Sequence, residues 1–118
     1  MSQSAQLHVA LAQLDLLVGD VGGNAARVVS EARRARDELH ADLAVFPELT
    51  LSGYPPEDLL FHRGLRTQIE QALAEVAAAS HGIALYVGYP EYDGDQIYNA
   101  AAFFHDGRLL AKHRKQCL

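Results

Sequence analysis

The chain has 118 residues, with 10 basic and 15 acidic side chains, so its formal net charge is −5. This length predicts one domain. The acidic balance argues against a nucleic-acid surface, which needs a basic patch, and against an anionic membrane partner. A single cysteine, Cys117, excludes an intrachain disulfide and fits a cytoplasmic protein. The first 20 residues carry no basic leader, so we expect a first strand there and no secretory signal.

The first part of the chain predicts a strand, a helix and a second strand. The apolar segment at residues 7–15 fits a buried strand. The segment "GDVGGN" then interrupts regular structure, and Asn24 is expected to cap the next helix. Apolar residues recur at helical spacing over residues 24–40, with charged residues between them. Residues 42–46 predict a second short, buried strand.

The rest of the chain predicts one more helix and three strands. Helical spacing runs from Leu65 to about residues 80–82, and an apolar strand follows at 83–89. The segment "EYDGDQ" has turn composition. Residues 97–104 and 108–115 then predict a hairpin with Asp-Gly at its turn. Alternating strands and helices indicate an α/β fold, in which helices cover a largely parallel sheet.

Glu48 stands directly after the second predicted strand, behind a proline. In open α/β sheets, ligands gather outside the carboxyl ends of the strands. The apolar neighbours Phe46, Leu49 and Leu51 are expected to exclude water from the carboxylate and raise the pKa of Glu48, which suits a general base near neutral pH. The spacing alone favours the other interpretation, a surface loop glutamate that caps the short helix near Glu57 and Asp58.

The segment "FPELTLSGYPPEDLL" closely resembles the first signature of the nitrilase, or carbon–nitrogen hydrolase, superfamily. Its "GYPPEDLL" part looks like one branch, the glutaminase domains of glutamine-dependent NAD synthetases. The segments "GDVGGN", "YNAAAFF" and "KHRKQCL" occur in the order that the family shows. The resemblance implies an α-β-β-α sandwich, of which this chain supplies the N-terminal portion, with parts of both sheets. Residues 1–118 would form a partial carbon–nitrogen hydrolase domain, with a synthetase domain expected downstream.

The resemblance also implies a Glu–Lys–Cys triad. Glu48 matches its general base, and Lys115 matches the lysine that stabilises negative charge on the carbonyl oxygen. Tyr54 matches a tyrosine that lines the glutamine pocket, although an aromatic ring packed over a turn is an equal alternative. Gly53 would give the turn its backbone freedom. Asn99 is interpreted as structural support.

Cys117 lies two residues from Lys115 and is therefore a tempting nucleophile. The family argues against it, because the family's nucleophile follows a later strand. By default a free cysteine is a small buried hydrophobe, and reactivity needs a lowered thiol pKa. We therefore expect the nucleophile beyond Leu118.

The resemblance implies glutamine hydrolysis that supplies ammonia to a synthetase domain, which uses ATP to adenylate deamido-NAD. ATP and Mg²⁺ are expected there, and this segment is expected to bind no cofactor or metal, since its six histidines form no metal-ligand spacing. The full-length protein is expected to be a cytoplasmic homo-oligomer without nucleic-acid or membrane partners. Two alternatives stay open: a stand-alone amidase acting on another small amide, and a non-catalytic fragment.

Overall fold

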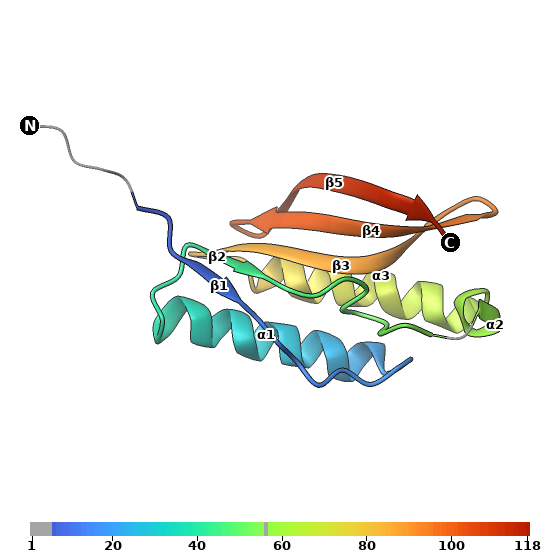
Figure 1. The fold of residues 1–118 in the computed structure, drawn as a ribbon, viewed down its shortest axis with the longest axis horizontal. Coiled ribbons are helices and arrows are strands. Elements are labelled where there is room, and N and C mark those ends of the chain that lie inside the picture. Colours follow the sequence, from blue (N-terminus) through green and yellow to red (C-terminus); the bar gives the residue numbers. More distant parts are fainter. Residues whose placement is uncertain (1–5, 56) are drawn as a thin grey trace, which may run out of the picture.

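A computed structural model describes residues 6–55 and 57–118 of the chain. Residues 1–5, where no leader is expected, and Pro56 of the Gly-Tyr-Pro-Pro turn lie outside the described residues. The described residues form one five-stranded sheet in the order β1-β2-β3-β4-β5, with helices against it (Figure 1). The predicted α/β class is confirmed.

The sheet is parallel in its first part and antiparallel in its second. Strands β1 (Val9–Leu11), β2 (Leu43–Val45) and β3 (Ala84–Asp93) run parallel. Strands β4 (Gln96–His105) and β5 (Arg108–Cys117) continue the sheet as antiparallel neighbours. The carboxyl ends of β1 and β2 therefore point the same way, and the chain after β2 emerges beside the middle of the longer β3.

Three helices make the crossovers between the parallel strands. Helix α1 (Val21–Asp37) connects β1 to β2, and α2 (Glu57–Leu60) with α3 (Arg63–Ala78) connects β2 to β3. Helices α1 and α3 pack side by side on one face of the sheet (Figure 1). The core lies between these helices and that face and contains Val28, Ala32, Ile69, Val76, Leu85, Val87 and Phe104.

The expectation that the chain contributes to both sheets of a sandwich is wrong. All five strands belong to one sheet, because a two-residue loop at Gly94 and Asp95 returns β4 directly alongside β3. The structure is thus one helix layer and one sheet. Its other sheet face carries two exposed apolar side chains on β1, Val9 and Leu11.

The start of α1 differs from the sequence prediction. Asp20, not Asn24, caps the helix, and its carboxylate accepts a hydrogen bond from the Gly23 N–H. Asn24 is fully buried one turn inside the helix. Its side chain bonds both the N–H and the carbonyl oxygen of Leu17 and also donates to the Leu51 carbonyl oxygen. Asn24 therefore fastens the loop before α1 to the loop after β2, a role that local sequence cannot reveal.

The third strand is longer than predicted. Glu91 and Tyr92, assigned to a turn from composition, pair with Tyr98 and Ile97 in the β3–β4 ladder. The turn itself is confined to two residues, with Gly94 at φ +57°. Composition was misleading because cross-strand pairing decides where such a polar strand end stops.

The predicted Asp-Gly hairpin is confirmed. Asp106 and Gly107 have φ values of +52° and +81° between β4 and β5, as a two-residue hairpin turn requires. Strand β5 is the last in the sheet order and all ten of its residues are exposed, so it is an open edge strand. Among the described residues, no helix is long and apolar enough to cross a membrane.

Candidate active site

The carboxylate of Glu48 is held by two side chains, one from the loop that follows it and one from β4. The Tyr54 hydroxyl donates a 2.8 Å hydrogen bond to Glu48 Oε2. The Asn99 amide, on β4, donates a 2.6 Å hydrogen bond to Oε1. Each carboxylate oxygen therefore has its own donor, and the orientation of the carboxylate is set by the sheet and by the loop that follows Glu48.

The predicted rise in the Glu48 pKa is wrong. The hydrogen bond from Tyr54, then that from Asn99, holds the pKa of the Glu48 carboxyl below its ordinary value. Partial loss of water opposes this shift, and the charge of Lys115 adds to it. The apolar neighbours are buried, but the Glu48 side chain stays 39% exposed and keeps contact with water. Glu48 is thus an ionised, oriented carboxylate at neutral pH.

Lys115 reaches Glu48 because of a β-bulge. The β4–β5 register passes from Ala100 opposite Arg114 to Asn99 opposite Gln116, so Lys115 has no partner on β4. A bulge of this kind re-aims the extra side chain. Lys115 Nζ lies 3.8 Å from Glu48 Oε1. The structure therefore brings together two residues that sequence reasoning placed in one site.

Tyr54 is 66% exposed and does not pack over the turn as the alternative reading supposed. Its hydroxyl is fixed by Glu48, while its ring faces solvent beside the carboxylate. The predicted freedom at Gly53 is confirmed by its φ of +68°; a Cβ there would lie 3.2 Å from Val18 Cα. Gly53 thus lets the chain turn close to the Val18 backbone, so that the Tyr54 hydroxyl lies within hydrogen-bond distance of Glu48.

Cys117 is exposed, so the expectation of a buried cysteine is wrong. It pairs with Tyr98, and its thiol donates to Gln96 Oε1 at 3.0 Å. Side chains alternate along a strand, so Gln96 and Tyr98 lie on the opposite face of β4 from Asn99. Cys117 therefore turns away from the face where Asn99 meets Glu48. The bulge at Lys115 breaks the simple rule that residues two apart share a face.

The contribution of Asn99 to the site goes beyond the structural support expected from sequence. Asn99 is 1% exposed, and its Oδ1 has no hydrogen-bond partner among the described residues. The sequence signal was a single amide inside the otherwise apolar strand "IYNAAAFF". A buried amide in such a run needs a polar partner, and here that partner is Glu48.

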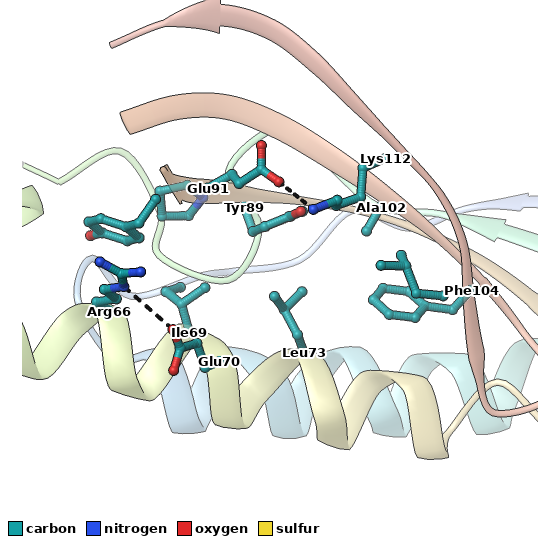
Figure 2. A pocket seen from close by; sticks show the side chains of 12 residues that line it. Arg66, Ile69, Glu70, Leu73, Tyr89, Glu91, Ala102, Phe104 and Lys112 are labelled. Atoms are coloured by element: carbon teal, nitrogen blue, oxygen red, sulfur yellow. Dashed lines mark hydrogen bonds and ion pairs between the residues drawn. The ribbon is translucent and has the colours of Figure 1, made fainter. Parts of the chain in front are cut away.

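A separate cleft of about 210 Å³ lies between α3 and the helix-facing side of β3, β4 and β5 (Figure 2). Glu48 is not among its lining residues. Its charged groups are already paired: Arg66 with Glu70, and Glu91 with Lys112 and Arg114. Burial raises the pKa of Glu91, but the hydrogen bonds from the two cations outweigh burial and leave it below the ordinary value. This ion cluster secures β5 to β3 and presents no free charge to a ligand.

An ionised carboxylate beside an ammonium can accept a proton from an incoming nucleophile while the cation stabilises an oxyanion. The sequence profile of the carbon-nitrogen hydrolase family matches residues 8–118. The chain belongs to that family and has the N-terminal portion of the nitrilase fold.

Within this family, the chain is similar to glutamine-dependent NAD(+) synthetases. The chain is 48% identical over 110 residues to the glutamine-dependent NAD(+) synthetase of Xanthomonas campestris pv. campestris, covering 93% of this chain and 20% of that protein. It is 37% identical to the synthetase of Aquifex aeolicus, over 95% of this chain and again 20% of the relative. The chain thus spans about a fifth of the length of the curated relatives it matches.

Two solved structures, of a synthetase and of an amidase, superimpose on the chain. The glutamine-dependent NAD+ synthetase of Acinetobacter baumannii, in complex with ADP, superimposes with a TM-score of 0.85 at 34% identity, over 92% of this chain and 20% of that one. An amidase from Nesterenkonia sp. superimposes with a TM-score of 0.84 at 26% identity, over 97% of this chain and 44% of that one.

Proposed function

We propose that this chain is the N-terminal part of a glutaminase domain, within a protein that makes NAD from deamido-NAD with glutamine as the nitrogen donor. The observation that carries the proposal is the pairing of Lys115 Nζ with Glu48 Oε1 at 3.8 Å. The two residues are far apart in the sequence, and both are the ones that the family resemblance selects. The similarity to the Xanthomonas campestris synthetase supports the choice of substrate.

The chemistry proposed for the pair is amide hydrolysis through a thioester. Glu48 accepts the proton of a cysteine thiol, and the thiolate attacks the side-chain carbonyl carbon of glutamine. Lys115 stabilises the oxyanion of the tetrahedral intermediate. As the C–N bond breaks, protonated Glu48 returns its proton to the nitrogen, and ammonia leaves. Water then cleaves the thioester, which yields glutamate and the free thiol.

Two parts of this reaction come from outside the described site. The thiol would come from a cysteine C-terminal to Leu118, since Cys117 turns away from Glu48. Ammonia would pass to a synthetase domain that adenylates deamido-NAD with ATP and Mg²⁺. Tyr54 is proposed to contact the substrate with its exposed ring while its hydroxyl holds Glu48. The proposal implies a cytoplasmic, homo-oligomeric enzyme.

The experiment measures NAD formation by the synthetase that contains this chain, with either glutamine or ammonium as nitrogen donor. The same test can use the Xanthomonas campestris enzyme with its matching residues replaced by residues 8–118. We expect both donors to support synthesis and free glutamate to appear only with glutamine. Synthesis from ammonium without glutamine hydrolysis would contradict the glutaminase assignment.

A second candidate is a stand-alone amidase, favoured by the likeness to the Nesterenkonia amidase. In one structure of that amidase, acrylamide has added to the active-site cysteine. A panel of small amides separates the two candidates. Turnover of simple aliphatic amides in preference to glutamine, with no deamido-NAD-dependent step, would favour the amidase.

A further inference from the structure

Gly88 lies in the middle of β3, directly beneath the backbone of Glu48. A Cβ at Gly88 would lie 2.6 Å from Leu49 N, 2.8 Å from Pro47 O and 3.0 Å from Glu48 Cα. All three atoms are backbone atoms, so no flexible side chain could swing away to make room. A glycine inside a strand often marks such a close approach of another backbone segment.

The chain between Phe46 and Leu51, here termed the Glu48 turn, is tied to β3 on both sides of Glu48. The Phe46 N–H donates to the Tyr86 carbonyl oxygen at 2.9 Å, and the Leu51 N–H donates to the Gly88 carbonyl oxygen at 3.2 Å. These bonds place the turn flat against the strand. The Glu48 turn therefore rests on β3 at the one position without a side chain.

The Glu48 turn has little freedom to adjust. Leu49 has a φ of +50°, a left-handed conformation that branched side chains rarely adopt, and it is 3% exposed. The Thr50 hydroxyl donates to the Pro47 carbonyl oxygen inside the turn. A group added beneath the turn would have to lift it as a unit, because its internal bonds and its buried leucine resist local rearrangement.

From this packing we propose that Gly88 is a positioning residue for the general base: its missing side chain sets the height of Glu48 above the sheet. That height allows Asn99 on β4 and Lys115 on β5 to reach the same carboxylate oxygen. Gly88 touches neither the reacting atoms nor the carboxylate and acts only through the Glu48 turn. The inference rests on the proposed function for its kinetic test but not for its structural test.

The kinetic test is Gly88→Ala in the full-length synthetase that contains this chain. The contact with Leu49 N would fall about 0.8 Å short of an ordinary 3.4 Å van der Waals contact. Since a misplacement of about 1 Å can cost roughly 10²-fold in rate, we expect glutamine hydrolysis to fall about ten- to hundredfold. Synthesis from ammonium should stay within about twofold of wild type. The acid limb of the glutaminase pH profile should move to higher pH, because a lifted Glu48 loses its bond from Asn99.

The matched control is Ala101→Gly, which changes one methyl group at the position paired with Gly88 on β4. This variant can loosen the sheet but puts nothing beneath the Glu48 turn, so its pH profile should match wild type. A Gly88→Ala enzyme with unchanged glutaminase rate and unchanged acid limb would overturn the proposal. So would an equal shift of the acid limb in both variants, because the effect would then be general loosening.

The structural test needs no activity. A crystal structure of Gly88→Ala should show the Glu48 turn displaced from β3 and the Asn99–Glu48 bond lengthened beyond hydrogen-bond range. An undisplaced turn would overturn the inference even if glutaminase activity proved absent from the wild type. If Gly88→Ala does not accumulate, Thr50→Val loosens the same turn from within. Thr50→Val should lower the rate of glutamine hydrolysis and move the acid limb of its pH profile to higher pH. A pH profile like that of wild type would contradict the proposal that the Glu48 turn sets the height of Glu48.

Discussion

The Asn99 amide donates to Glu48 Oε1, the same oxygen that faces Lys115 Nζ at 3.8 Å. One carboxylate oxygen thus receives a neutral donor from β4 and a cation from β5, while Tyr54 occupies the other oxygen. This arrangement favours the ionised form of Glu48. It produces a base that is ready at neutral pH, and it relies on orientation more than on raised basicity.

Glu48→Gln tests the base directly. The amide keeps the shape of the side chain but cannot accept the thiol proton. In the full-length synthetase, glutamine-dependent NAD formation should fall by about 10²- to 10⁴-fold, the range of general acid–base catalysis. Synthesis from ammonium should be spared. Steady-state rates with each nitrogen donor provide the measurement, and equal loss of both activities would make Glu48 a structural residue.

Tyr54→Phe tests how the carboxylate is tuned. The hydrogen bond from Tyr54 is the largest cause of the lowered Glu48 pKa, so its removal should raise that pKa. The base must be ionised, and the acid limb of kcat/KM for glutamine should therefore move to higher pH. Tyr98→Phe is the matched control, because Tyr98 lies on the face of β4 opposite to Asn99 and its ring stacks on Arg114. A pH profile unchanged in Tyr54→Phe would contradict the assigned role of its hydroxyl.

The position of Glu48 at a strand end could be predicted from sequence, because Pro47 ends an apolar run and local pattern is enough. Its contacts could not be predicted in this way. The reach of Lys115 depends on a bulge that shifts register by one residue, and the place of Asn99 depends on a two-residue turn at Gly94. Both are properties of strand pairing, which local sequence determines only weakly. The lowered pKa of Glu48 does not follow from its apolar neighbours, because it depends on which side chains donate to the carboxylate: Tyr54 in the loop that follows it and Asn99 on β4.

Cys117→Ala tests whether the nucleophile lies elsewhere. Cys117 is exposed and faces Gln96, so removing its sulfur should leave glutamine turnover within a few-fold of wild type. Loss of a catalytic nucleophile costs about 10⁶-fold in kcat. Labelling of Cys117 by a thiol reagent without inactivation would agree with the prediction. A loss of glutamine turnover of about 10⁶-fold would instead identify Cys117 as the nucleophile.

Glu91→Gln tests the ion cluster on the helix side of the sheet. The Glu91 side chain is 9% exposed and accepts from Lys112 and Arg114. Losing its charge should reduce the free energy of unfolding by about 1–3 kcal/mol, as for hydrogen bonds to charged groups. Asp93→Asn is the control; its side chain is 63% exposed and should contribute less than about 1 kcal/mol.

The pH dependence of this effect has a defined sign. The folded-state pKa of Glu91 lies below its unfolded value. Its contribution to stability is therefore complete above the unfolded pKa, about 4.3 for glutamate, and disappears as pH falls through the folded pKa. Thermal unfolding of wild type and Glu91→Gln should converge in that acidic range. A stability difference that persisted at the lowest pH would attribute the effect to packing.

Residues 1–118 expressed alone should neither hydrolyse glutamine nor behave as a stable monomer. Glu48 and Lys115 can polarise an amide, but Cys117 is turned away and supplies no acyl acceptor beside them. The sheet face opposite the helices carries Leu11, 77% exposed, and β5 ends the sheet as an edge strand whose ten residues are all exposed. An uncovered apolar face and an open edge strand both favour association. Light scattering should report oligomers or aggregates, and ammonia release should not exceed that of Glu48→Gln. A monodisperse chain that melts cooperatively would contradict the structural argument, and ammonia release by it would contradict the assignment of the nucleophile to another part of the protein.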